Sequence, residues 1–176
     1  MTVEKTTEKG IERGDLVEEK KPRTKIIYKD TPLAEITLRK YEKPYDLPHR
    51  ELVRKLCLSM GLLQPGDSRD IIVDILHVLL MAKKEKKELS SDEIRDIVIK
   101  TRKDANLILA GVAASNMRRQ LKRLRDLFLV EKLKNKYRIN EHESLNKIFQ
   151  EKIEQYLLQT VLSRVKDYFD VIDREF

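Results

Sequence analysis

Hydrophobic residues recur at helical intervals over most of the chain after residue 47. Residues 48–60 predict a first helix, because their apolar side chains follow i, i+3, i+4 spacing: Leu52, Val53, Leu56, Cys57 and Met60. Gly61 then occupies a position suited to the left-handed end of a helix. Residues 69–84, with Ser68 as the N-cap, predict a second helix. Its apolar face is too wide for a surface helix, which indicates a place at the centre of the core.

A reciprocal capping signal begins the next predicted helix, over residues 91–101. Ser90 is placed as the N-cap, and Glu93, three residues later, is placed to reach back to its backbone. A stretch without clear periodicity follows and ends at Gly111, which predicts a break. A further helix is then predicted over residues 113–128.

Short hydrophobic segments at residues 130–133 and 136–139 predict a β-hairpin, because only two polar residues separate them. After the hairpin, Asn140 and Glu143 have the spacing of a second capping box. Neither glycine nor proline follows, so the pattern predicts one long terminal helix over residues 141–176.

The chain before the first helix has a different character. Residues 1–30 hold eight basic and seven acidic side chains with little apolar periodicity, which predicts a flexible charged tail. Within it, residues 25–29 have the composition of a short strand. Residues 31–67 form an N-terminal extension that contains the first helix. In residues 31–45, alternating apolar side chains favour a strand, whereas a proline near a first turn favours a short helix; the strand is the preferred prediction.

The positive charge of the chain is concentrated in one segment. The formal net charge is +7, and residues 112–138 carry nine basic side chains against two acidic ones. The rest of the chain is balanced, with 28 basic and 28 acidic side chains. A local excess of this kind is typical of a surface that binds a polyanion.

Three segments resemble the winged-helix transcription regulators of archaea and bacteria, of MarR-like and ArsR-like type. They are LSSDEI at residues 89–94, GVAASNMRRQLKRLRDLFLVEK at 111–132 and KYRI at 136–139. The resemblance covers residues 68–140 and implies a mainly α fold, a winged helix-turn-helix with a three-helix core and a β-hairpin wing. In those families fewer residues separate the positions matching Glu93 and Gly111 than the 17 found here. The second helix is therefore longer, or a short helix is inserted at residues 105–110.

The predicted helix over residues 113–128 has an apolar stripe opposite a basic face. The stripe consists of Met117, Leu121, Leu124 and Phe128. A helix buried on one side and cationic on the other fits the major groove of DNA, where Arg, Asn and Ser can read base edges. The alternative is a solvated basic surface. The candidate contacts are Ser115, Asn116, Arg118 and Arg119 for bases and Lys122 and Arg123 for phosphates. The resemblance adds contacts from the wing to the backbone or minor groove, by Lys134, Lys136 and Arg138.

Apolar residues near the end of the terminal helix alternate steps of four and three, the spacing of a coiled-coil seam. They are Leu158, Leu162, Val165, Phe169, Ile172 and Phe176. The seam predicts a dimerisation element. The alternative is that the helix packs back on the N-terminal helix of its own chain.

Composition and spacing argue against several other classes of protein. The three histidines are far apart with no metal-ligand spacing, the five glycines form no phosphate loop, and no residue is marked as an activated nucleophile. We therefore expect no enzyme, no metal and no cofactor. One cysteine, a polar start and the lack of a long apolar run favour a cytoplasmic protein without a membrane segment. Abundant Lys, Arg and Glu are typical of thermophile, including archaeal, proteins.

The sequence thus favours a homodimeric, sequence-specific regulator of transcription that binds double-stranded DNA, with the helix at 113–128 in the major groove and the wing at 130–139 on the backbone. One alternative is a winged-helix protein-interaction module of the transcription or replication machinery. RNA binding is a weaker alternative, since few aromatic residues are free to stack on bases. A small-molecule effector is left open.

Overall fold

The computed structural model describes residues 30–176. The predicted charged tail and the short strand at 25–29 lie outside the described residues, apart from residue 30. The chain divides into two units, residues 1–33 and 34–176. All helices and strands of the described part belong to the second unit.

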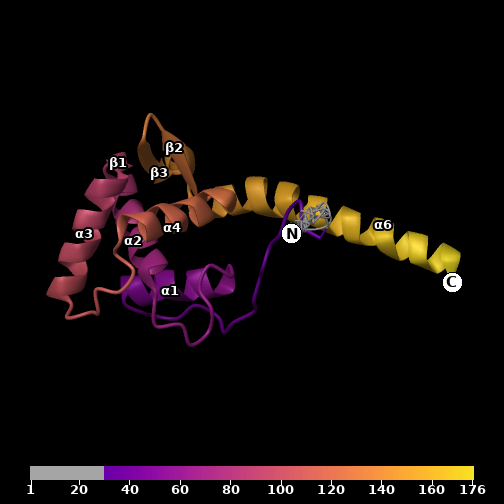
Figure 1. Cartoon of the computed structure of the whole chain (residues 1–176), viewed down its shortest axis with the longest axis horizontal. Coiled ribbons are helices and arrows are strands. Elements are labelled where there is room, and N and C mark those ends of the chain that lie inside the picture. The colour runs from indigo at the N-terminus through magenta and orange to yellow at the C-terminus, as the bar shows by residue number, and fades with distance from the viewer. Residues whose placement is uncertain (1–29) are drawn as a thin grey trace, which may run out of the picture. The chain divides into compact units, whose positions relative to one another are not determined.

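The second unit is mainly helical, with one small antiparallel sheet and a long helix at its C-terminal end (Figure 1). Its first elements are α1 (His49–Ser59), α2 (Ile71–Lys84), β1 (Leu89–Ser90), α3 (Ser91–Asp104), α4 (Ala114–Asp126), β2 (Val130–Leu133) and β3 (Lys136–Ile139). After a 3-10 turn, η2 (Asn140–His142), one continuous helix runs through α5 (Leu145–Ile148), a π-helical stretch η3 (Phe149–Leu158) and α6 (Gln159–Glu175).

Helix α2 lies at the centre of the core, as its wide apolar face predicted. It packs against α1, α3, α4 and β3. Of the nine residues 71–79 of α2, all except His77 are buried, including one charged residue, Asp74. Because other elements surround α2 on several sides, its sequence is apolar almost all round.

The sheet has the strand order β1-β3-β2, and all neighbours are antiparallel. The hairpin of β2 and β3 has the predicted bounds, with Leu133 opposite Lys136. The two residues between the strands, Lys134 and Asn135, both have positive φ, 44° and 67°, which is the geometry that matches the twist of paired strands. Strand β1 was not predicted, because two residues are too short to show alternation.

Residues 31–45 form neither the strand that was preferred nor a short helix, so that prediction is wrong. The segment instead makes backbone and side-chain hydrogen bonds with the end of α1 and the turn after it. The Arg39 backbone N–H donates to the Ser59 carbonyl (2.8 Å), and its guanidinium donates to the Leu58 and Leu63 carbonyls (2.9 and 3.2 Å). Gly61 has φ +68°, and an added Cβ would lie 2.5 Å from Cβ of Thr37. The left-handed end of this helix is therefore confirmed.

Two predicted helix starts are corrected by local hydrogen bonds. Ser68 does not cap α2; the Asp67 carboxylate accepts from the Arg69 N–H (2.9 Å) in a turn, and the helix begins only at Ile71. Asn140 does not cap the terminal helix, because its amide donates to the Phe128 carbonyl (3.0 Å). Ser144 is the cap that the structure uses, accepting from Lys147 N–H.

The capping box of Ser90 and Glu93 is confirmed, with both reciprocal hydrogen bonds present. Of the two ways to span the 17 residues before Gly111, the structure uses a longer α3, which reaches Asp104. No helix forms at residues 105–110. Asn106, with φ 51°, follows the end of α3, and Gly111, with φ +83°, marks the predicted break before α4.

Candidate nucleic-acid interface

Helix α4 is held by the apolar stripe that the sequence indicated. Met117, Leu121 and Leu124 are essentially inaccessible. Phe128 lies beyond the helix with φ 58° and is only half-buried, so it ends the stripe rather than extending it. Gln120, which was not part of the predicted stripe, is buried instead. This packing fixes which side of α4 faces solvent.

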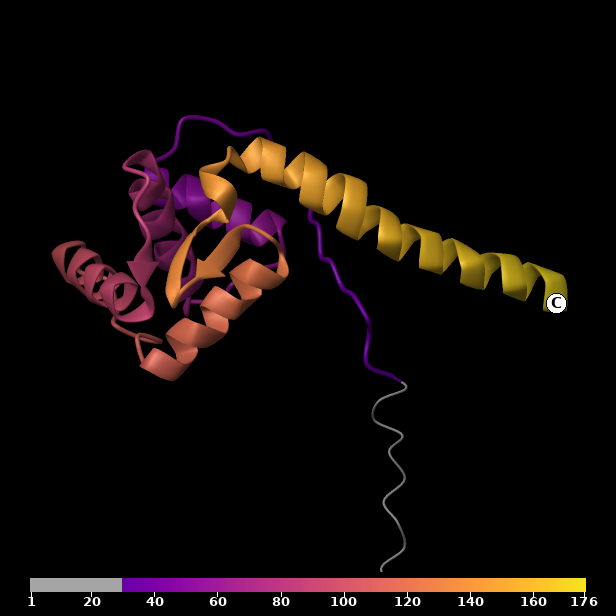
Figure 2. The ribbon, with the colours of Figure 1, turned by 90° about the horizontal axis from the view of Figure 1, so that it is seen from above.

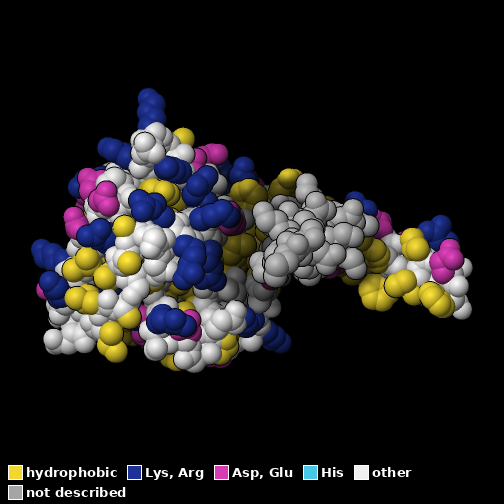
Figure 3. Space-filling model, viewed as in Figure 1, with side chains coloured by type: hydrophobic (Ala, Val, Ile, Leu, Met, Phe, Trp, Pro, Cys, Tyr) yellow, Lys and Arg dark blue, Asp and Glu magenta, His cyan; other side chains and the backbone are white. Residues whose placement is uncertain are grey.

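The solvent side of α4 carries basic residues that protein groups neutralise little. Figure 3 shows Lys and Arg side chains in a band over α4, with more on the hairpin above it. Lys122 makes one exposed pair with Asp126 (3.0 Å). In the described part of the chain, the side chains of Arg118 and Arg125 make no ion pair or hydrogen bond, and both residues are exposed. Their charges are therefore available to an external anion.

Asn116, a predicted base contact, has its amide group satisfied inside the protein. Its Nδ2 donates to the Gly111 carbonyl (2.7 Å). Its Oδ1 accepts from Arg119 (2.8 Å) and Gln120 (3.1 Å). An added Cβ on Gly111 would lie 2.9 Å from Nδ2 of Asn116, so the two residues form a tight corner at the start of α4. This arrangement gives Asn116 a role in positioning the helix and its arginine.

Replacing Asn116 with alanine is expected to lower the free energy of unfolding by about 1–3 kcal/mol, because three hydrogen-bonding partners lose their bond. Urea denaturation of the variant measures this loss. Ser115→Ala is the matched control: Ser115 is the exposed neighbour of Asn116, and its replacement changes stability by about 0.5 kcal/mol or less. Unchanged stability of Asn116→Ala would show that the amide is free for another partner.

An open cavity of about 750 Å³ lies beside the first half of α4. Its lining includes Arg69, Arg119 and Arg123, with Asp67 as the acidic member. The Arg69 side chain is 79% exposed, and its Nε lies 3.7 Å from the Asp67 carboxylate. Arg69 is not among the contacts predicted from the sequence, because it lies outside the basic segment at residues 112–138. Its place in the fold extends the cationic surface beyond α4.

Arg123 and Arg138, two predicted contacts, are engaged in the protein. Arg123 donates to the Gln120 side chain (2.9 Å) and to the Gly61 carbonyl (3.3 Å). Arg138 pairs with Glu131 (2.7 Å) and Glu88 (2.9 Å). The hydrogen bond that Arg138 donates to the Glu131 carboxylate, more than any other contact, raises the pKa of Arg138. Both arginines therefore brace neighbouring segments instead of extending into solvent.

At the hairpin tip, Lys134 and Lys136 are exposed, and neither makes an ion pair within residues 30–176. Lys132 lies over the Tyr137 ring, 5.7 Å from its centroid. The tip thus presents two lysines to solvent near the end of the basic band.

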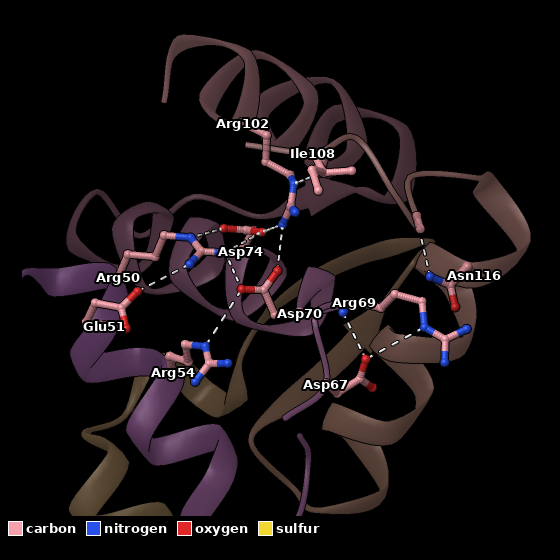
Figure 4. A network of polar contacts seen from close by, with 11 residues as sticks. Arg50, Glu51, Arg54, Asp67, Arg69, Asp70, Asp74, Arg102, Ile108 and Asn116 are labelled. Carbon is pink, nitrogen blue, oxygen red and sulfur yellow. Dashed lines mark hydrogen bonds and ion pairs between the residues drawn. The ribbon is translucent and has the colours of Figure 1, made fainter. Parts of the chain in front are cut away.

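A largely buried ion-pair network that was not predicted from the sequence lies between α1, the start of α2 and α3 (Figure 4). Arg50 of α1 contacts Asp74 through Nε and Asp70 through a terminal nitrogen, both at 2.7 Å. Arg102 of α3 contacts the same two carboxylates, Asp70 at 3.1 Å, and is only 3% exposed. Its Nε also donates to the Ile108 carbonyl (2.8 Å). The network joins α1, α2, α3 and the loop that leads to α4.

The charges of this network balance, two guanidinium groups against two carboxylates. Burial alone would raise the pKa of Asp70, but hydrogen bonds from Arg50 and Arg102 outweigh it and hold the pKa below its ordinary value. Burial acts against the charged form of Arg50 too, yet Asp74 and Asp70 raise its pKa. The sequence signal was available: Asp70 and Asp74 are four residues apart at the start of an otherwise apolar helix.

The described residues offer little support for a metal site, a reactive cysteine or a membrane-spanning helix. Residues 30–176 contain no group of three or more His, Cys, Asp or Glu side chains arranged to hold a metal ion. Burial raises the pKa of the Cys57 thiol to about 12, so this cysteine behaves as a small core residue. None of the described helices is both long and apolar enough to cross a membrane.

Comparisons of the chain with protein-family models, with curated proteins and with solved structures find no match.

Proposed function

We propose that this chain binds double-stranded DNA through α4 and the β2–β3 hairpin, as a transcription regulator of winged helix-turn-helix architecture. The succession α2, β1, α3, α4, β2, β3 and the strand order β1-β3-β2 support this architecture. The observation that carries the function is the charge: the whole net positive charge of the chain falls in residues 112–138. Within them, the exposed cations lie on the solvent side of α4 and at the hairpin tip.

Because one side of α4 is buried against the core, only its opposite side is available to contact DNA. The major groove is about 12 Å wide and admits one helix. Ser115 and Arg118, exposed near the start of α4, are placed for base edges, with Arg119 oriented by Asn116. Lys122 and Arg125, further along, are placed for phosphates. Asn116, Arg123 and Arg138 are assigned to positioning, because protein groups already occupy their polar atoms.

Replacing both Lys134 and Lys136 with alanine is expected to weaken DNA binding about tenfold near physiological salt, because two phosphate contacts are lost. The plot of log affinity against log salt concentration becomes less steep by about 2, and the loss is similar for all duplex sequences. Fluorescence titrations at several salt concentrations measure both effects. An unchanged salt slope would remove the hairpin tip from the interface.

Titration of the full chain with a mixed-sequence duplex, and with single-stranded RNA of the same length, tests the class of ligand. The proposal predicts micromolar or tighter binding of the duplex at low salt and weaker binding of the RNA. Preference for the RNA would contradict the proposal, since α4 is assigned to the groove of a duplex.

One observation favours the second candidate, a protein-interaction module. Three apolar side chains are exposed on α3 and the loop after it: Ile97 (40%), Ile108 (76%) and Leu109 (39%). A protein partner could cover them. This function predicts that Ile108→Glu abolishes binding of such a partner. It also predicts that the wild-type chain has no affinity for duplex DNA.

A further inference from the structure

Helix α6 carries an apolar face that the described chain leaves uncovered. None of its residues is buried. Leu162 and Val165 are 42% and 44% exposed, and Phe169 and Ile172 are 63% and 53% exposed. Figures 1 and 2 show α6 extending beyond the other elements of its unit, with no other helix or strand beside it. The structure therefore does not show α6 packing back on α1.

The apolar positions of the terminal helix form two stripes with different spacing. In the first part, Ile148, Ile153 and Leu157 are buried against the core, separated by steps of five and four residues. The π-helical geometry of η3, with more residues per turn, keeps such positions on one side. From Leu158 onward the steps are four and three, a mean of 3.5, which is the period of helices that supercoil around a similar helix. The second stripe thus lies away from the core and has the spacing of a helix that pairs with another helix.

The charge of α6 fits a second copy of the same helix. Residues 159–175 carry three basic and four acidic side chains, so two copies meet without strong net repulsion. Because α6 is nearly neutral and lacks the positive charge of α4, it is unsuited to binding DNA. We propose that α6 pairs with α6 of a second copy of this chain, and that the two helices run antiparallel.

The orientation follows from the sizes of the seam residues. In heptad terms Leu162 and Phe169 occupy a positions, and Val165 and Ile172 occupy d positions. Parallel two-stranded coiled coils favour the reverse, β-branched residues at a and Leu at d. In an antiparallel pair, a faces d, so Val165 meets Phe169 of the second copy and Leu162 meets its Ile172. The Val165–Phe169 layer joins a smaller with a larger side chain, and the Leu162–Ile172 layer joins two side chains of equal size, whereas an in-register parallel pair would stack Phe on Phe and Val on Val.

Sedimentation equilibrium of the full chain at micromolar concentration tests the pairing. We expect a mass of twice 20.8 kDa for the wild type and 20.8 kDa for Val165→Glu with Phe169→Glu. The control, Thr160→Glu with Ser163→Glu, adds the same charge away from the seam and stays dimeric. A monomeric wild type, or a seam variant that remains dimeric, would overturn the proposal.

Disulfide formation tests the orientation. The native Cys57 is fully buried and does not compete. An oxidised mixture of Val165→Cys and Phe169→Cys chains should contain a cross-linked heterodimer, while each variant alone cross-links little, because disulfides need Cα atoms within about 7 Å. Efficient cross-linking of Val165→Cys alone would show a parallel pair and refute the antiparallel one. Neither test contains DNA, so their failure would leave the proposed function standing.

Discussion

Replacing Arg118 and Arg119 with alanine is expected to lower the affinity for duplex DNA by about 30-fold or more, because each arginine contact with a base contributes about 1–3 kcal/mol. Arg118 is exposed, and within residues 30–176 its side chain makes no ion pair or hydrogen bond, while Arg119 is oriented by its hydrogen bond to Asn116. Both lie near the start of α4, where a helix in the major groove comes closest to the bases. Fluorescence anisotropy with a labelled duplex measures the change.

Two comparisons make this result specific. Lys84→Ala with Arg164→Ala removes the same charge from exposed positions on α2 and α6 and should change affinity much less. Arg118→Ala with Arg125→Ala removes two side chains that have no hydrogen-bond or ion-pair partner within residues 30–176, so it leaves the corner at Asn116 intact and should still weaken binding. Equal effects of the α4 pair and the control pair would mean that α4 is not the reading helix.

Arg102→Leu is expected to lower the free energy of unfolding by about 3–5 kcal/mol, the usual cost of removing one partner from a buried ion pair. Arg102 and Asp74 are each only 3% exposed, so water does not replace the lost charge. The variant also loses the bond to the Ile108 carbonyl, which ties down the loop before α4. Urea denaturation monitored by circular dichroism measures the loss.

Arg54→Leu is the matched control, because Arg54 approaches Asp70 only to 3.9 Å and is 29% exposed; we expect it to cost about 1 kcal/mol or less. A similar small loss for Arg102→Leu would contradict the assigned role. The pH dependence is a second measurement. Because the folded pKa of Asp70 is lowered, its stabilisation is present above the unfolded pKa of about 3.9 and is lost as pH falls through the folded value. Arg102→Leu should therefore move acid unfolding to higher pH.

Elements with local signals were predicted well. Helix α1, the Ser90 capping box, the break at Gly111 and the hairpin are encoded by residues close in sequence. Apolar spacing and left-handed positions act within a few residues, so one sequence is enough to find them.

Features that depend on distant partners were not predictable in this way. Asn140 has the sequence of a helix cap, but its amide bonds to the Phe128 carbonyl across the hairpin. Residues 31–45 alternate like a strand, yet Arg39 binds the end of α1. The same reason explains why the candidate site was predicted only in part. The sequence located the basic face, but only the fold shows that the side chains of Asn116 and Arg138 contact other groups of the protein. Arg69 joins the cationic surface only in the folded chain, where it lines the cavity beside α4.

The salt dependence of duplex binding by the wild-type chain is the decisive measurement for the proposal that α4 and the hairpin bind DNA. Four cations are assigned to phosphates: Lys122, Arg125, Lys134 and Lys136. The account predicts micromolar or tighter binding at about 50 mM salt, and a slope of log affinity against log salt of about −3 to −4 up to about 200 mM. No micromolar binding at the lower concentration, or a slope near zero, would contradict it.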